Sequence, residues 1–218
     1  MKYLLFLITL LVIQCSHAQQ AAPFQDEINQ FKQQDKEHFP PKNAIVFTGS
    51  SSFRMWSDVQ DYFPGYTIIN RGFGGSTLPD VIRYAPDIIF PYHPKQVVIY
   101  CGDNDLASAD TVTANTVFER FKTLFTMIRQ QEPKASVVFV SIKPSPSREQ
   151  LMPRMKEANA LIQQYLKTKQ HTAYVDVFTP MLDATGKPRK ELFKEDMLHM
   201  KPAGYAIWQK ALQSYLLK

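Results

Sequence analysis

The sequence predicts an α/β protein, in which a parallel sheet of about five strands lies between two layers of helices. Short runs rich in apolar and β-branched residues recur along the chain, and segments of helical period separate them. The runs show no alternation of apolar and polar residues, which is typical of strands buried on both faces. The expected architecture is therefore a three-layer α/β/α arrangement.

The elements follow one another in a regular order. Phe24, Ile28 and Phe31 recur at helical spacing before Pro40 and Pro41, which predicts a lead-in helix. The predicted strands lie at residues 44–47, 66–69, 96–100, 136–140 and 172–177. The clearest helical periods lie at 117–128 and 155–166, with a last helix at 203–217. No internal repeat or long linker divides the chain, so we expect one domain over residues 19–218.

The first residues have the pattern of a secretory signal peptide. Lys2 precedes an apolar run at 3–13, and the small residues Ser16 and Ala18 follow at signal-peptidase positions. We expect residues 1–18 to be removed by cleavage after Ala18, leaving a secreted or periplasmic chain. The apolar run is shorter than the roughly 20 residues that span a bilayer, so no stable membrane insertion is expected.

The two cysteines lie on either side of this cleavage site. A lipoprotein anchored through Cys15 is the alternative form, but the bulky Gln14 precedes it where such sites prefer a small residue. After cleavage Cys101 is the one remaining cysteine, so no internal disulfide is expected. Cys101 continues the apolar run at 97–100, which favours a buried small residue over a reactive thiol.

Composition excludes several classes of function. The 218 residues are 44% hydrophobic and 21% charged, as in a globular protein. The formal net charge is +5, yet Lys and Arg are scattered, so no nucleic-acid partner is expected. The whole chain has only 5 His, which are few ligands for a two-metal site, and we expect no metal or other cofactor. The composition gives no information on oligomeric state.

The polar residues that follow the predicted strands are the candidates for chemistry. In an open parallel sheet, ligands bind outside the carboxyl ends of the strands. A hydroxyl cluster at 48–52 follows the first strand, a glycine turn at 70–77 the second, and Gly-Asp-Asn-Asp at 102–105 the third. Asp196 and His199 lie in the loop before the last helix.

Together these segments resemble the SGNH (GDSL-type) hydrolases. Residues 47–51 are similar to block I of that family, 70–75 to block II, 102–105 to block III, and the Asp-x-x-His at 196–199 to block V. All four blocks occur in the family order and span nearly the whole mature chain. The resemblance implies a flavodoxin-like fold and serine esterase activity.

By position, the resemblance implies Ser51 as nucleophile, His199 as general base and Asp196 as the carboxylate that orients the imidazole. The backbone N–H groups of Ser51 and Gly75 and the side-chain amide of Asn104 would form the oxyanion hole. The chemistry agrees, because a serine hydroxyl attacks an ester efficiently only when an imidazole takes its proton.

Each candidate also has a structural interpretation. Ser50 stands where the family usually has Asp, so three consecutive serines, 50–52, compete for the nucleophile's role, and they could equally cap a helix. Asn104 could simply shape a turn. A second Asp-x-x-His, Asp35 to His38, is assigned to the solvated face of the lead-in helix.

We therefore expect a secreted serine esterase that hydrolyses acetyl or other short acyl esters, on small molecules or glycans, through an acyl-enzyme. The alternative activities within the family are those of a lysophospholipase or an acyl thioesterase. Less favoured are a metal-dependent phosphoesterase using Asp103, Asp105, Asp196 and His199, and a non-catalytic binding module. An α/β-hydrolase would need a Gly-x-Ser-x-Gly elbow, which is lacking.

Overall fold

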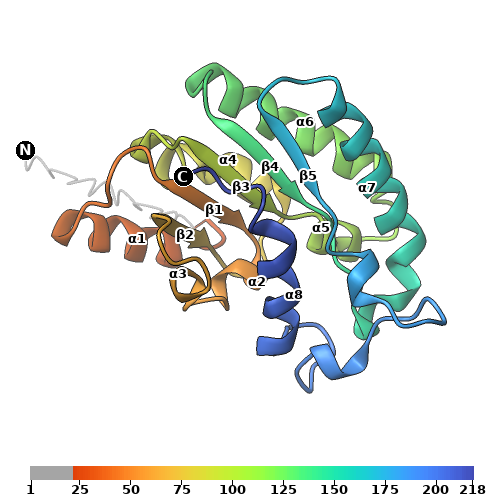
Figure 1. Ribbon diagram of the computed structural model, residues 1–218. Coiled ribbons are helices and arrows are strands. Elements are labelled where there is room, and N and C mark those ends of the chain that lie inside the picture. Colours follow the sequence, from red (N-terminus) through yellow and green to blue (C-terminus); the bar gives the residue numbers. More distant parts are fainter. Residues whose placement is uncertain (1–21) are drawn as a thin grey trace, which may run out of the picture.

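A five-stranded parallel sheet forms the centre of the computed structural model, which describes residues 22–218 (Figure 1). The proposed signal peptide at 1–18 lies outside the described residues. The strands are β1 (Ile45–Gly49), β2 (Ile68–Gly72), β3 (Gln96–Tyr100), β4 (Ser136–Val140) and β5 (Thr172–Val175). Their order across the sheet is β2-β1-β3-β4-β5. This is the flavodoxin-like order, so the predicted fold class is confirmed.

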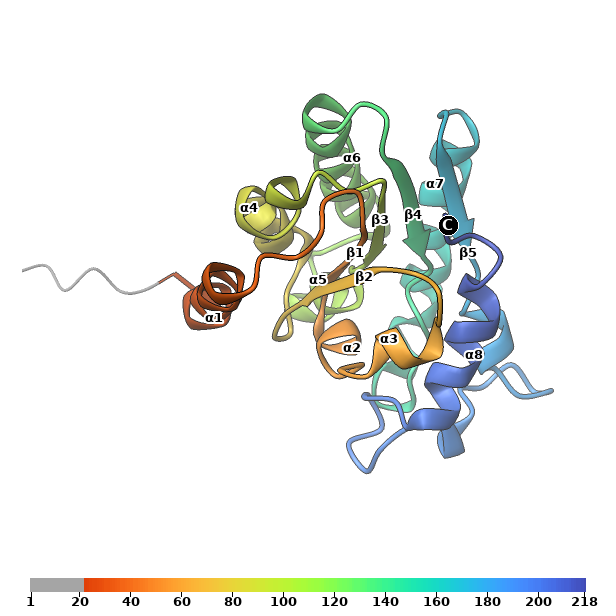
Figure 2. The same cartoon turned by 60° about the vertical axis from the view of Figure 1, so that its left-hand side comes forward.

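Helices cover both faces of the sheet (Figures 1 and 2). One face packs against α1 (Gln25–Glu37), α4 (Leu78–Ile88), α6 (Ala114–Gln131) and α7 (Met152–Lys167), with α5 (Asp103–Ser108) at its edge. The other face packs against α2 (Ser51–Arg54), α3 (Val59–Tyr62) and α8 (Pro202–Leu212). No helix within residues 22–218 has the length and apolarity needed to cross a bilayer.

Alternate residues of each strand enter opposite cores, which explains why the strands read as continuous apolar runs. In β1, Val46 faces the α4 side while Ile45 and Phe47 face the α8 side. All five residues of β1 and all five of β3 are buried. With each face covered by helices, a polar side chain in the middle of these strands would lose water without gaining a partner.

An aromatic cluster fixes α2 and α8 against the sheet. Trp56, just after α2, and Trp208 of α8 are both fully buried, with ring centroids 6.2 Å apart. Tyr205 stacks on Trp56 at 4.9 Å, and its hydroxyl donates to the carbonyl of Ser52 at 2.9 Å. These contacts join the segment that carries the serine cluster to the helix that follows His199.

The second strand begins and ends later than predicted. It covers Ile68–Gly72, and its last residue, Gly72, is the partner of Gly49 in β1. Asn70 and Arg71 are thus strand residues rather than part of the glycine turn. Polar residues are tolerated here because β2 is an edge strand: the Asn70 side chain donates to the carbonyls of Phe53 and Trp56. The last helix also ends early, at Leu212.

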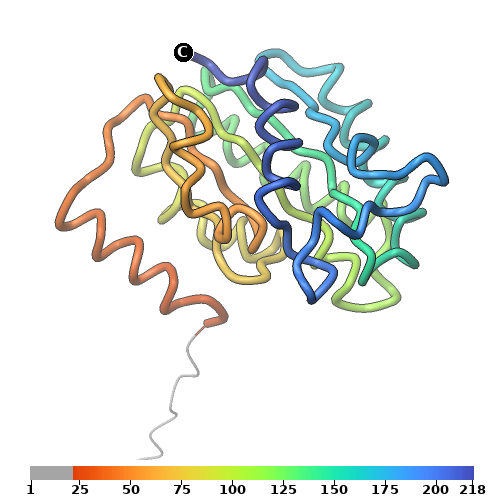
Figure 3. Tube along the Cα trace, turned by 60° about the horizontal axis from the view of Figure 1, so that its bottom comes forward, coloured from red at the N-terminus to blue at the C-terminus, as the bar shows by residue number. Residues whose placement is uncertain are grey.

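The lead-in helix α1 is confirmed, and it packs beside β2 and α4 at one edge of the molecule (Figure 3). The assignment of Asp35 to a solvated face is wrong. Its carboxylate forms an ion pair with Arg71 of β2 at 2.5 Å and accepts from the Tyr92 hydroxyl at 2.5 Å. Arg71 of the edge strand is buried, and its positive charge needs a partner there, which the carboxylate of Asp35 provides. His38 is exposed, as expected.

Candidate active site

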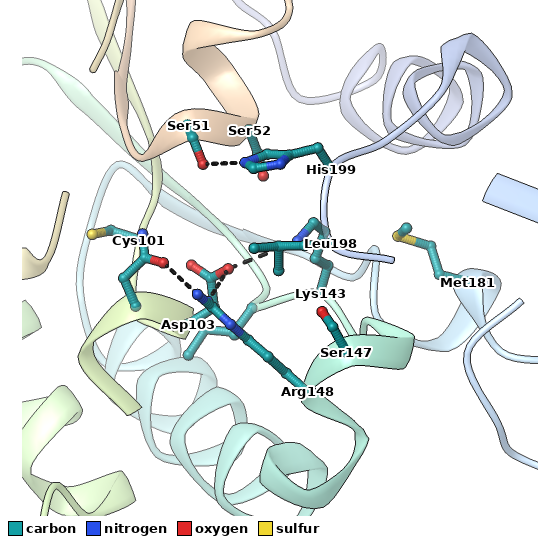
Figure 4. Close-up of polar contacts among 12 residues, drawn as sticks. Ser51, Ser52, Cys101, Asp103, Lys143, Ser147, Arg148, Met181, Leu198 and His199 are labelled. Atoms are coloured by element: carbon teal, nitrogen blue, oxygen red, sulfur yellow. Dashed lines mark hydrogen bonds and ion pairs between the residues drawn. The ribbon is translucent and has the colours of Figure 1, made fainter. Parts of the chain in front are cut away.

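Three segments far apart in sequence bring polar groups together at the carboxyl end of the sheet. Ser51 begins α2 directly after β1, and Asn104 lies in the first turn of α5 after β3. The loop before α8 carries Asp196 and His199. Figure 4 shows the imidazole of His199 directed at the hydroxyl of Ser51.

Ser51, His199 and Asp196 form a continuous hydrogen-bonded chain. The Nε2 atom of His199 lies 3.0 Å from Ser51 Oγ, and its Nδ1 atom lies 2.6 Å from Asp196 Oδ2. The other carboxylate oxygen, Oδ1, accepts from the backbone N–H groups of Leu198 and His199, each at 2.9 Å. With Nδ1–H donated to the carboxylate, Nε2 is free to accept the hydroxyl proton.

The carboxylate of Asp196 is ionised over a wide pH range. Desolvation of this group is the largest single effect and would raise its pKa, but hydrogen bonds from the His199 side chain and from the backbone N–H groups of His199 and Leu198 together outweigh it. They lower the pKa of Asp196 to about 2. An ionised partner can stabilise the imidazolium that forms when His199 takes up a proton.

The three consecutive serines differ in their surroundings. Ser51 is partly exposed and its hydroxyl meets His199, whereas Ser50 and Ser52 are buried. The hydroxyl of Ser50 has no hydrogen-bond partner among residues 22–218, although its carbonyl accepts from Phe53 and Arg54 at the start of α2. The expected choice of Ser51 therefore agrees with the geometry, and Ser50 also serves as the backbone cap of the helix.

The three expected oxyanion-hole donors come from the segments that follow β1, β2 and β3. The N–H of Ser51 is at the N-terminus of α2, where a helix leaves its first N–H groups without intrahelical acceptors. A Cβ atom on Gly75 would be 3.8 Å from Asn104 Nδ2, so these two residues are neighbours. The Asn104 amide donates one proton to the Ser76 carbonyl at 3.1 Å and retains a second.

Glycines make this close packing possible. At Gly49, φ is +132° and a Cβ atom would lie 1.8 Å from the carbonyl oxygen of Tyr100. At Gly72, a Cβ atom would lie 2.6 Å from that of Phe53, in the helix that begins with Ser51. Side chains at either position would push the serine segment away from its neighbours.

The carboxylates of the Gly-Asp-Asn-Asp segment are neutralised by basic side chains. Asp103 pairs with Arg148 at 3.0 Å and with Lys143 at 3.7 Å, and the buried Asp105 pairs with Arg120 at 2.7 Å. In the described part of the chain, no three His, Cys, Asp or Glu side chains are grouped to hold a metal ion. This arrangement gives no support to the metal-dependent alternative.

Cys101 is buried, as the sequence predicts. Burial raises the pKa of its thiol well above the usual range, and the nearby carboxylates of Asp105 and Asp103 add to the shift. A thiol held protonated in this way is a poor nucleophile. Its Sγ atom lies 3.4 Å from the Ser76 carbonyl, so it packs behind the oxyanion-hole segment.

The segment that follows β4 also contributes to the site, although no sequence motif singled it out. Lys143, Ser147 and Arg148 all lie at the same end of the sheet as Ser51 (Figure 4). Arg148 donates to Asp103 and Asn104, while Ser147 donates to the carbonyl of Met197 in the Asp196–His199 loop. The strand-end rule that selected the other segments would have selected this one too, since it directly follows the fourth strand.

The flavodoxin-like sheet and the hydrogen-bonded chain of Ser51, His199 and Asp196 are those expected of an ester hydrolase of the family that the sequence resembles. A model of the GDSL-like Lipase/Acylhydrolase family matches residues 44–207, so the chain belongs to this family of ester hydrolases. The expected resemblance is thereby confirmed. A comparison with curated proteins returned no match.

Solved structures share the fold at low sequence identity. A protein from Streptococcus pneumonia, provisionally described as a platelet activating factor, is 22% identical, with 88% of this chain and 92% of that chain covered and a TM-score of 0.77. A GDSL-like lipase from Bacteroides thetaiotaomicron is 20% identical, covering 86% and 96%, with a TM-score of 0.72. An acetylxylan esterase mutant from Geobacillus stearothermophilus is 14% identical, covering 82% and 96%, with a TM-score of 0.62.

Proposed function

We propose that this chain is an exported serine esterase that removes acetyl or other short acyl groups from carbohydrates through an acyl-enzyme on Ser51. The observation that carries the proposal is the contact of His199 Nε2 with Ser51 Oγ at 3.0 Å, with Asp196 on the other imidazole nitrogen at 2.6 Å. Nucleophile, base and orienting carboxylate are thus in hydrogen-bond order.

The reaction has two steps. Ser51 Oγ attacks the ester carbonyl carbon while its proton passes to His199 Nε2, and the carbonyl oxygen gains negative charge between the N–H groups of Ser51, Gly75 and Asn104. Collapse of this intermediate breaks the bond to the alcohol, which leaves with the proton from His199. Water then attacks the acyl-enzyme, again with His199 as base, and releases the acid and free Ser51.

Support for a carbohydrate ester comes from two sources. The acetylxylan esterase of Geobacillus stearothermophilus has the same fold over most of its length. Lys2 and the apolar residues 3–13 predict export, which would place the enzyme where polysaccharides are found. Lysophospholipase or thioesterase activity is the alternative within the family, because the catalytic groups are the same for each ester.

The test is a substrate panel on the purified chain with residues 1–18 removed. Acetylated xylo-oligosaccharides, lysophospholipids, acyl thioesters and chromogenic esters of graded chain length would be compared by kcat/KM. We expect the acetyl esters to have the highest kcat/KM and Ser51→Ala to abolish their turnover.

Ser50→Ala is the matched control and should stay active, because the hydroxyl that it removes is buried and makes no hydrogen bond among residues 22–218. A preference for long-chain or thioester substrates would overturn the acetyl specificity. Activity that persists in Ser51→Ala would overturn the mechanism.

A further inference from the structure

The segment after β4 contacts both halves of the catalytic apparatus. Arg148, in the short helix η2 (Pro146–Leu151), has a half-buried side chain whose Nη2 donates to Asn104 Oδ1 at 2.9 Å. Its Nη1 donates to Asp103 Oδ2 at 3.0 Å. Neighbouring Ser147 donates twice to the carbonyl of Met197, from its N–H at 3.1 Å and from its hydroxyl at 2.9 Å.

These contacts fix which way the Asn104 amide faces. Arg148 has only donors, so it can contact only the oxygen of the amide, and the Ser76 carbonyl has only lone pairs, so it can contact only the nitrogen. With both ends assigned, Nδ2 is held on the side of Gly75. A rotated amide would set its oxygen against Ser76 O and its NH₂ against the guanidinium, which costs both hydrogen bonds.

We propose that Arg148 is a positioning residue that holds the Asn104 amide with its nitrogen toward the ester oxygen, and this inference rests on the proposed role of Asn104. An oxyanion-hole donor is effective only when it is oriented before the reaction, since turning it during the reaction would consume the stabilisation that it provides. Arg148 supplies that orientation from outside the site.

The guanidinium is itself held by a buried carboxylate. Asp103 has a side chain 5% exposed and accepts from Arg148, while the fully buried Lys143 lies 3.7 Å from the same oxygen. Burial lowers the pKa of Lys143, opposed by the attraction of Asp103. Figure 4 shows Arg148 reaching across from η2 toward Asp103, beneath Ser51 and His199. Asp103 is thus the anchor and Asn104 the group that is oriented.

Ser147 plays a similar positioning role for the loop that carries the general base, His199. Met197 lies between Asp196 and His199 and has a φ of +55°, in the left-handed region that non-glycine residues seldom adopt. The two hydrogen bonds from Ser147 hold the Met197 carbonyl in that conformation. One short segment therefore positions an oxyanion-hole donor through Arg148 and the triad loop through Ser147.

Arg148→Lys tests the inference, because lysine keeps the positive charge near Asp103 but cannot donate from a planar fork to two acceptors. We expect kcat on a chromogenic acetyl ester to fall at least about tenfold, with KM changed less than about threefold, since a small misplacement of a catalytic group slows the chemical step. Arg83→Lys, on the exposed side of α4, is the matched control and should be normal. Circular dichroism and thermal unfolding report whether each variant is folded; if Arg148→Lys is not, Arg148→Gln replaces it.

A double-mutant cycle separates positioning from a merely structural role. If Arg148 acts through Asn104, adding Arg148→Lys to Asn104→Ala should lower kcat no further, because the amide that it orients is gone. Losses that multiply would overturn the inference, and so would a normal kcat in Arg148→Lys beside a damaged Asn104→Ala. Normal kcat in Asn104→Ala would instead refute the proposed oxyanion role of Asn104, and the inference with it.

Discussion

Replacing Asn104 separates a catalytic amide from a structural one, because its two hydrogen bonds respond differently to different substitutions. Asn104→Ala removes both the contact to Ser76 O at 3.1 Å and the contact from Arg148 at 2.9 Å. The first is a neutral hydrogen bond worth about 1 kcal/mol and the second a charged one worth about 1.5–3 kcal/mol. We expect the free energy of unfolding to fall by about 2.5–4 kcal/mol.

We expect Asn104→Asp to be more stable than Asn104→Ala but no more active. An aspartate keeps the acceptor for Arg148 and gains an ion pair, and we expect this gain to exceed the repulsion between its second oxygen and the Ser76 carbonyl, so this variant should be more stable than Asn104→Ala at neutral pH. Its carboxylate has no proton for the oxyanion and repels it, so kcat should fall at least as far as in Asn104→Ala, about 10²–10³-fold.

Urea unfolding and steady-state kinetics on a chromogenic acetyl ester measure the two quantities. The expected pattern is that Asn104→Asp is the more stable variant and no more active than Asn104→Ala. A structural role alone predicts that activity follows stability, so the aspartate variant would be the more active one. Near-normal kcat in Asn104→Asp would remove Asn104 from the oxyanion hole.

Two further predictions follow from close packing and from charge. Gly49→Ala should lower the free energy of unfolding by at least about 3 kcal/mol, because its Cβ would lie 1.8 Å from the Tyr100 carbonyl oxygen. Gly65 also has a positive φ but lies in open space, so Gly65→Ala should cost only about 1–2 kcal/mol. Urea unfolding measures both values. The pKa of Asp196 is lowered to about 2 in the folded state, below its value in the unfolded chain, so its ionised form stabilises the fold above about pH 4. The difference in unfolding free energy between wild type and Asp196→Asn should therefore diminish as pH falls from about 4 to about 2; a difference that grew over this range would contradict the sign.

The sheet could be predicted because its signal is local and strong. Buried parallel strands such as 96–100 and 136–140 are continuous apolar runs, and the observed bounds agree with them. The edge strand β2 was placed too early because Asn70 and Arg71 are polar, and only tertiary partners make them acceptable in a strand. The pattern of apolar residues therefore does not predict where a strand ends when its last residues are polar.

Only part of the candidate site could be predicted from the sequence, for a similar reason. Ser51, Asn104 and His199 lie in motifs whose spacing is local, so they could be selected without coordinates. Arg148 acts on a residue 44 positions away, and Asp35 reaches Arg71 across 36 positions. Nothing in the residues around an arginine or an aspartate indicates a partner so distant, since ion pairs across elements depend on how helices dock.

Covalent labelling of the nucleophile tests the central claim most directly. A fluorophosphonate reacts with an activated serine by losing fluoride, and mass spectrometry of the digested protein locates the bond that forms. The proposed mechanism predicts one adduct, on Ser51 Oγ, formed in step with loss of esterase activity and strongly slowed in His199→Ala. An adduct on Ser50 or Ser52, or full activity after complete labelling of Ser51, would contradict it.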